Sequence, residues 1–157
     1  DQILAGKDIT LTSSEMSRFI MTIEEASRLV IESSEEAKGG EVFITKMPVA
    51  RISDLAAVMI EVLTDKHDLP GDCKINEIGV KPGEKMYEEL MSEEETSRAL
   101  ETKDYFVVLP AFRDLYPVDY VYKNTVEEPS LRPYNSSEEV TLTPQELKDY
   151  LLKYKII

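Results

Sequence analysis

The stretch at residues 79–90, which reads GVKPGEKMYEEL, constrains what this chain can fold into more than any other segment. Its pattern predicts a strand, a tight turn and then a helix, because Pro82 fixes its φ angle and Gly83 lets the backbone turn sharply. Lys81 can meet a phosphate group as a point charge, and Glu84 can accept hydrogen bonds from hydroxyl groups. This pair suits a ligand with anionic and hydroxyl parts, such as a nucleotide sugar. The alternative is a surface turn in which Glu84 only caps the helix that follows.

The composition is that of a soluble globular protein and excludes several classes of function. The length of 157 residues fits one domain with a sizeable core, and no apolar run is long enough to cross a membrane. The single cysteine, Cys73, and the single histidine, His67, exclude an internal disulfide and a metal site built on these residue types. The net charge of −13 argues against nucleic acid and anionic membrane surfaces as partners. We therefore expect a cytoplasmic protein, in which Arg18 and Lys81 supply the positive charge for an anionic ligand.

Hydrophobic periodicity predicts strands that alternate with helices. Helices are expected at residues 22–38, 52–65, 85–91, 93–100 and 143–154, and strands at residues 7–12, 17–21, 42–44, 75–80 and 105–109. Thr22 with Glu25, and Thr143 with Glu146, have the spacing of capping boxes, which fixes the starts of two helices. The continuous apolar run at residues 42–44 is typical of a buried parallel strand.

This alternation indicates an α/β fold that is rich in helix and has short strands. The sheet is too small for a doubly wound domain, so we expect a lobe that completes a larger sheet. The predicted division is a lobe at residues 1–110, an irregular extended arm at residues 111–137 and a C-terminal helix at residues 138–157. A helix of that length is marginal alone, so it must pack on its own lobe or on a neighbouring subunit. Surface exposed on such a lobe favours self-association, and a homo-oligomer is expected.

Residues 79–90 resemble the (R/K)PGEK(L/M)(Y/H)EEL motif of the nucleotide-sugar 4,6-dehydratases of polysaccharide and capsule biosynthesis. These are extended short-chain dehydrogenases that act on UDP-N-acetylglucosamine. Further segments resemble the same family in the same order, at residues 15–22, 37–44, 92–100 and 134–148. The ordered set covers nearly the whole chain. Lys81 stands where the family more often has Arg, which keeps the charge but loses the bidentate geometry of a guanidinium.

The resemblance implies a substrate-binding role for Arg18, Lys81 and Glu84. For Arg18, the alternative is a surface side chain paired with Glu15 or Glu24. No catalytic, cofactor-binding or metal-binding residue is implied in this chain. The family carries its Gly-rich dinucleotide loop and its Tyr-x-x-x-Lys pair in its N-terminal half, and this sequence has neither.

We therefore expect the C-terminal, substrate-binding lobe of an extended short-chain dehydrogenase, without the Rossmann-type NAD(P)-binding domain. The expected partners are a UDP-sugar and the missing N-terminal dinucleotide-binding domain. NAD or NADP is implied for the parent enzyme, and this chain alone is expected to be inactive. Two alternatives stay open: the lobe of a related UDP-sugar epimerase or reductase, and a non-catalytic acidic interaction domain.

Overall fold

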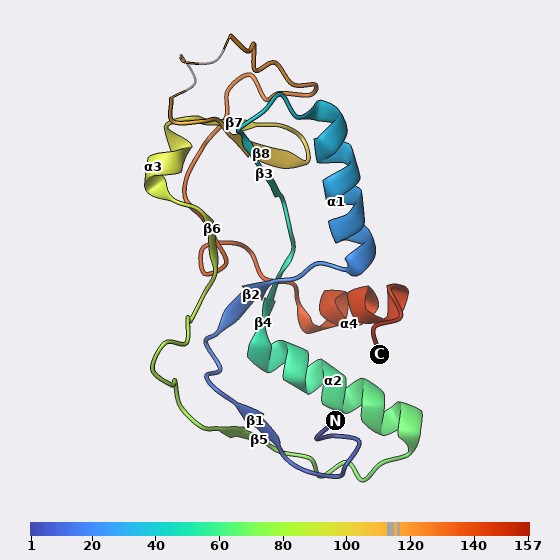
Figure 1. Cartoon of the computed structure of the whole chain (residues 1–157). Helices are drawn as coiled ribbons and strands as arrows, with labels where there is room; N and C mark the ends of the chain where they lie inside the picture. Colours follow the sequence, from blue (N-terminus) through green and yellow to red (C-terminus); the bar gives the residue numbers. More distant parts are fainter. Residues whose placement is uncertain (113–114, 116) are drawn as a thin grey trace. The chain divides into compact units, whose positions relative to one another are not determined.

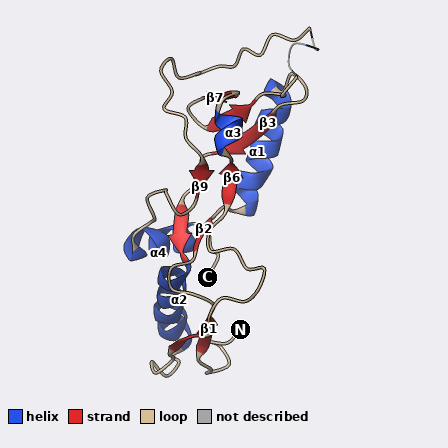
Figure 2. Ribbon diagram, turned by 90° about the vertical axis from the view of Figure 1, so that its left-hand side faces the viewer, coloured by secondary structure: helices blue, strands red, loops and turns tan. Residues whose placement is uncertain are grey.

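The computed structural model describes residues 1–112, 115 and 117–157 as a mixed α/β chain with short strands (Figure 1), which confirms the predicted class. Its helices are α1 (Ile23–Glu36), α2 (Ile52–His67), α3 (Glu93–Thr96) and α4 (Pro144–Lys153). Its strands are β1 (Ile9–Leu11), β2 (Ser17–Phe19), β3 (Val42–Thr45), β4 (Val49–Arg51), β5 (Ile75–Glu77), β6 (Glu89–Met91), β7 (Ala99–Glu101), β8 (Tyr105–Val108) and β9 (Tyr134–Asn135). Long loops separate several of these elements (Figure 2). Over the described residues, no helix combines the length and the apolar character needed to cross a bilayer.

The described residues form two compact units, and each gathers segments that are distant in sequence. The first unit consists of Asp1–Ile20, Pro48–Glu88 and Ser136–Ile157, and the second of Met21–Met47 and Glu89–Asn135. These units group residues by their contacts. The predicted lobe, arm and C-terminal helix are divided by expected role instead, so that division stays a prediction. Residues 113, 114 and 116 of the predicted arm lie outside the described residues.

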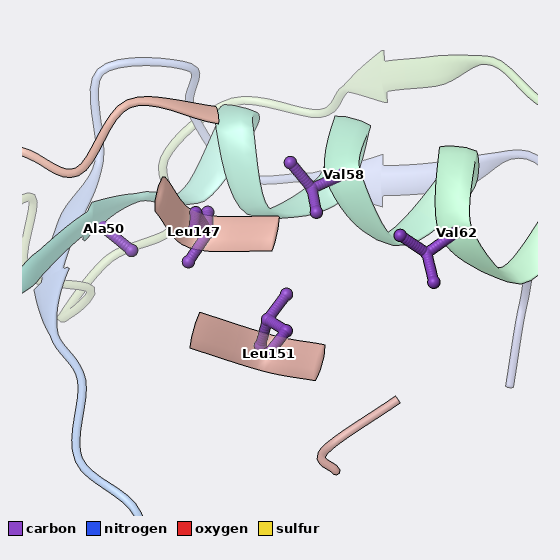
Figure 3. Packing of buried hydrophobic residues seen from close by; sticks show 5 residues of the cluster. All are labelled: Ala50, Val58, Val62, Leu147 and Leu151. Atoms are coloured by element: carbon purple, nitrogen blue, oxygen red, sulfur yellow. The ribbon is translucent and has the colours of Figure 1, made fainter. Parts of the chain in front are cut away.

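The core of the first unit lies where α4 packs against α2. It consists of apolar side chains from β4 and both helices, namely Ala50, Val58, Val62, Leu147 and Leu151 (Figure 3). The predicted capping box starts α4, because the Thr143 hydroxyl accepts the Glu146 N–H and the Glu146 carboxylate accepts the Thr143 N–H. The C-terminal helix therefore docks on its own unit, which was one of the two predicted places. β1 pairs in parallel with β5, and β2 pairs antiparallel with β4.

The second unit is built on the antiparallel sheet β3-β8-β7. Its core contains Val107, Leu109 and Tyr122. The predicted parallel direction of β3 is wrong, because the strand runs antiparallel to β8. Its predicted burial holds in part: Ile44 is buried, whereas Val42 is 56% exposed. An apolar run carries no information on strand direction, which explains the error in direction. The predicted Thr22 capping box starts α1 and is confirmed.

One predicted helix is absent, and another is shorter than expected. Residues 85–91 form an irregular segment that ends in β6, and the helix expected at residues 93–100 stops at Thr96, before β7. The backbone groups of the first segment bond to distant partners instead of to each other. The carbonyls of Lys85 and Met86 accept hydrogen bonds from Arg18, and the N–H of Glu88 donates to Ser136. These bonds leave no set of groups for an i to i−4 helical ladder.

Candidate functional site

The candidate site is an exposed loop that is held at both of its ends. We call residues 79–88 the KPGEK loop. Before it, the Ile78 N–H donates to the carbonyl of Leu11 at 2.8 Å, and at its far end the Ser17 N–H donates to the carbonyl of Met86 at 3.0 Å. Between these anchors every residue at positions 79–85 is exposed. Gly83 has a φ angle of 88°, a conformation that side-chain-bearing residues rarely adopt, so glycine is needed at this turn.

Lys81 and Glu84 face each other across the turn of this loop. The Glu84 carboxylate accepts the Lys81 N–H through Oε2 at 2.9 Å, and the Glu84 N–H donates to the Lys81 carbonyl at 3.1 Å. Glu84 therefore closes the turn, and because no helix follows, the alternative that it caps one is wrong. Its Oε1 atom is left to accept further hydrogen bonds. Among the residues that the structure describes, no carboxylate pairs with the Lys81 ammonium, which extends from the exposed turn.

Arg18 reaches the same loop from β2. Its Nη1 donates to the carbonyls of Ser17 at 2.7 Å and Met86 at 3.2 Å, and its Nη2 donates to the carbonyl of Lys85 at 2.6 Å. Its Nε lies 3.4 Å from Oε1 of Glu88, and the side chain is 26% exposed. Its ion-pair partner is thus Glu88 rather than the expected Glu15 or Glu24. The structure brings Arg18 beside the predicted site, and its contact with a ligand stays a prediction.

Ser136 also contacts the KPGEK loop, although no chemical pattern in the sequence singles it out. The side chain is 1% exposed, and its Oγ lies 2.9 Å from Oγ of Ser17 and accepts the Glu88 N–H at 3.0 Å. The Ser136 N–H donates to the Glu88 carbonyl at 2.8 Å. The only sequence signal was its place in the segment at residues 134–148 that resembles the dehydratases.

A separate cavity of about 250 Å³ lies in the second unit, between α1 and the sheet. Tyr105 and Tyr122 line it, together with acidic side chains that include Glu32. Burial raises the pKa of Tyr105 to about 12, and the hydrogen bond to the Glu32 carboxylate adds to the shift. Burial also raises the pKa of Tyr122, with a smaller effect from the charge of Glu41. Both phenols are therefore protonated and uncharged at neutral pH, which makes them poor nucleophiles or bases.

The sequence of the chain matches a known protein family. Residues 1–110 match the model of a family described as polysaccharide biosynthesis protein, and the chain belongs to this family. It is accordingly related to the nucleotide-sugar epimerases and dehydratases of polysaccharide biosynthesis.

Individual relatives cover nearly all of this chain. It is 44% identical over 152 residues to an uncharacterized membrane protein of Methanocaldococcus jannaschii, which covers 96% of this chain and 42% of that protein. It is 32% identical over 152 residues to a UDP-glucose 4-epimerase of Rickettsia rickettsii, with coverage of 97% and 43%. The crystal structure of Pen from Bacillus thuringiensis superposes with a TM-score of 0.84 at 39% identity, over 99% of this chain and 44% of that one. The chain thus spans less than half the length of these relatives.

Proposed function

We propose that this chain is the nucleotide-sugar-binding portion of a UDP-N-acetylglucosamine 4,6-dehydratase that acts in surface polysaccharide biosynthesis in the cytoplasm. The observation that carries the proposal is the KPGEK loop. On an exposed turn that is anchored at both ends, it presents the ammonium of Lys81, which has no carboxylate partner among the described residues. It also presents the carboxylate of Glu84, of which only Oε2 is engaged within the turn. The family membership and the sequence resemblance support the same assignment.

Each residue has a distinct role in this proposal. Lys81 meets the pyrophosphate of the ligand as a mobile cation, and Oε1 of Glu84 accepts hydrogen bonds from ribose hydroxyls. Arg18 donates three hydrogen bonds to backbone carbonyls and pairs with Glu88, and in this proposal its remaining N–H capacity serves a ligand oxygen. The chain has a net charge of −13, which repels an anionic ligand. The positive charges of Arg18 and Lys81 reduce this repulsion locally at the site.

The redox cofactor, NAD or NADP, belongs to the dinucleotide-binding domain implied by the resemblance. The residues of this chain do not fit such a cofactor, because α1, α2 and α4 follow Thr22, Arg51 and Thr143 rather than a glycine-rich loop that could cradle a pyrophosphate. We accordingly assign no catalytic step to this chain and expect it to turn over no substrate alone.

Two other functions compete with this one. A UDP-sugar epimerase is favoured by the relative named UDP-glucose 4-epimerase, which is 32% identical to this chain over 152 aligned residues. The chemical difference between an epimerase and a dehydratase lies in residues beside the substrate sugar that this chain does not supply. A non-catalytic acidic interaction domain is the third possibility, and it requires no ligand at the KPGEK loop.

Calorimetric titration of the complete protein with UDP, followed by incubation with UDP-N-acetylglucosamine, separates these functions. We expect UDP to bind, and we expect the sugar product to be a 4-keto-6-deoxy derivative, lighter by one water. A product of unchanged mass with an inverted C4 centre would assign the epimerase. No binding of UDP would overturn the proposal and leave the interaction domain.

A further inference from the structure

The KPGEK loop is not held in place by burial of its own side chains. No side chain at positions 79–85 is buried, and Gly79 and Gly83 have positive φ angles, which glycine adopts without steric cost. The two hydrogen bonds between Lys81 and Glu84 close the tip, but they do not fix where the tip lies. The position of Lys81 and Glu84 therefore depends on the anchors at the ends of the loop.

The anchor at the exit of the loop is a buried cluster of polar groups. Ser136 holds both backbone groups of Glu88, because its Oγ accepts the Glu88 N–H and its N–H donates to the Glu88 carbonyl. The same Oγ lies 2.9 Å from Oγ of Ser17, and both serines are buried. Hydrogen bonds between buried groups gain strength from the low local dielectric, and losing one partner leaves a costly unsatisfied group.

Arg18 extends this anchor toward the tip. Its guanidinium donates hydrogen bonds to the carbonyls of Lys85 and Met86, the two residues that follow Glu84. The planar group suits this task, because its N–H groups diverge at fixed angles and can hold two carbonyls at once. Arg18 also bonds the carbonyl of Ser17, so the guanidinium and the Ser17–Ser136 pair form one connected network.

We propose that Ser136 is a positioning residue, and that Arg18 positions the loop in addition to its proposed ligand contact, so that the C-terminal tail (residues 136–157) sets the affinity of the KPGEK loop for a nucleoside diphosphate. A loop that is already held in place loses less conformational entropy when the ligand binds. The inference rests on the proposed function, since it concerns the same site. It adds that a residue with no ligand contact, in a tail that otherwise packs on α2, controls that site.

The test is Ser136→Ala in the complete protein, with Ser13→Ala as the matched control. Ser13 is also a buried serine of the first unit, but its Oγ accepts the Glu15 N–H at 3.3 Å rather than a group of the KPGEK loop. Ser136→Ala removes the hydrogen bonds of Oγ with the Glu88 N–H, the Ser17 hydroxyl and the Ser17 carbonyl, and we expect it to raise the Kd for UDP about tenfold. Ser13→Ala should leave that Kd within about twofold of the unmodified protein, even if both variants lose thermal stability.

Amide hydrogen exchange gives a second measurement that needs no ligand. Ser136→Ala should speed exchange at residues 81–88 and leave the amides of α2 unchanged, and Arg18→Lys should do the same although it keeps the charge. Equal acceleration in α2 would mean general destabilisation and would overturn the proposal. An unchanged Kd for UDP in Ser136→Ala would overturn it as well. If the unmodified protein binds no UDP, the proposed function fails, and the control of a ligand site by Ser136 fails with it.

Discussion

At the scale of single residues, Lys81 and Glu84 differ in how much of their binding capacity the loop itself uses. Glu84 commits one carboxylate oxygen to the Lys81 N–H, whereas the Lys81 side chain contributes nothing to the turn. Glu84 substitutions therefore change the loop and the ligand contact together. Substitutions of Lys81 change only the charge offered to the ligand, which makes Lys81 the cleaner probe of the site.

We predict that Lys81→Ala in the complete protein weakens binding of UDP by about 1–3 kcal/mol, the range for a lost charge-assisted contact. Lys81→Arg should be tolerated, since the resembling family more often has Arg at this position. Lys7→Ala, which removes an exposed lysine of the same unit outside the loop, serves as the control. Calorimetry measures all three, and an unchanged affinity in Lys81→Ala would make Lys81 an ordinary surface residue.

A second prediction at this scale concerns the pKa of Tyr105, which burial and Glu32 raise from 10.0 to about 12. In the unfolded chain the phenol loses its proton near its ordinary pKa, while the folded protein still holds it. The stability from this group is therefore complete below pH 10 and is lost as the pH rises toward 12. Glu32→Gln should lower the pKa of Tyr105, but not fully to 10.0, because burial persists. Titration of the ring signals by NMR, assigned with Tyr105→Phe, measures the shift, and an unchanged pKa in Glu32→Gln would contradict the assignment to Glu32.

At the scale of elements, two helices share the same N-terminal capping box and differ in what they bury. The α4 helix contributes Leu147 and Leu151 to a core, whereas α1 has no buried residue. We predict that Thr143→Ala lowers the unfolding free energy of the first unit by about 1 kcal/mol. Thr22→Ala should fray α1 and reduce helix content with a smaller loss in denaturant midpoint. Circular dichroism during guanidinium unfolding compares the two variants, and equal losses would show that α1 is as tightly coupled as α4.

The elements that were predicted correctly are those whose structure is determined by residues within their own segments. The helices α1 and α4 are determined by capping boxes and periodicity within their own segments, and α2 by its periodicity, so the sequence predicts all three. The predicted helix at residues 85–91 fails because its carbonyls and N–H groups bond to Arg18 and Ser136. No pattern inside the segment records partners that are 48 to 68 residues away.

The candidate site divides in the same way. Lys81 and Glu84 are three positions apart on one turn, so their proximity could be predicted from the motif alone. The approach of Arg18 was expected only from the resemblance, and its bonds to the loop backbone were not expected at all. Ser136 is brought to the loop by the tertiary fold, across 119 residues from Ser17, and a lone serine carries no chemical signal of such a role.

At the scale of the whole molecule, the chain contains two cores that use different architectures. The first unit buries helix α4 against α2 around Leu147, which is fully buried. The second unit packs side chains on an antiparallel sheet around Val107, which is also fully buried. Each unit is assembled from segments that are far apart in sequence, so neither corresponds to a continuous stretch that could be cut out of the chain.

We predict that these cores respond separately to substitution. Leu147→Ala should cost the first unit about 2–5 kcal/mol, and Val107→Ala should cost the second about 2 kcal/mol, since each leaves a cavity in a close-packed interior. Leu152→Ala, on the same helix as Leu147 but 46% exposed, should cost far less. Hydrogen exchange resolved by residue reports on each unit, with α2 following Leu147 and β8 following Val107. If both substitutions accelerated exchange equally in α2 and β8, the two units would unfold together as one cooperative body. The prediction that each core has its own unfolding free energy would then be wrong.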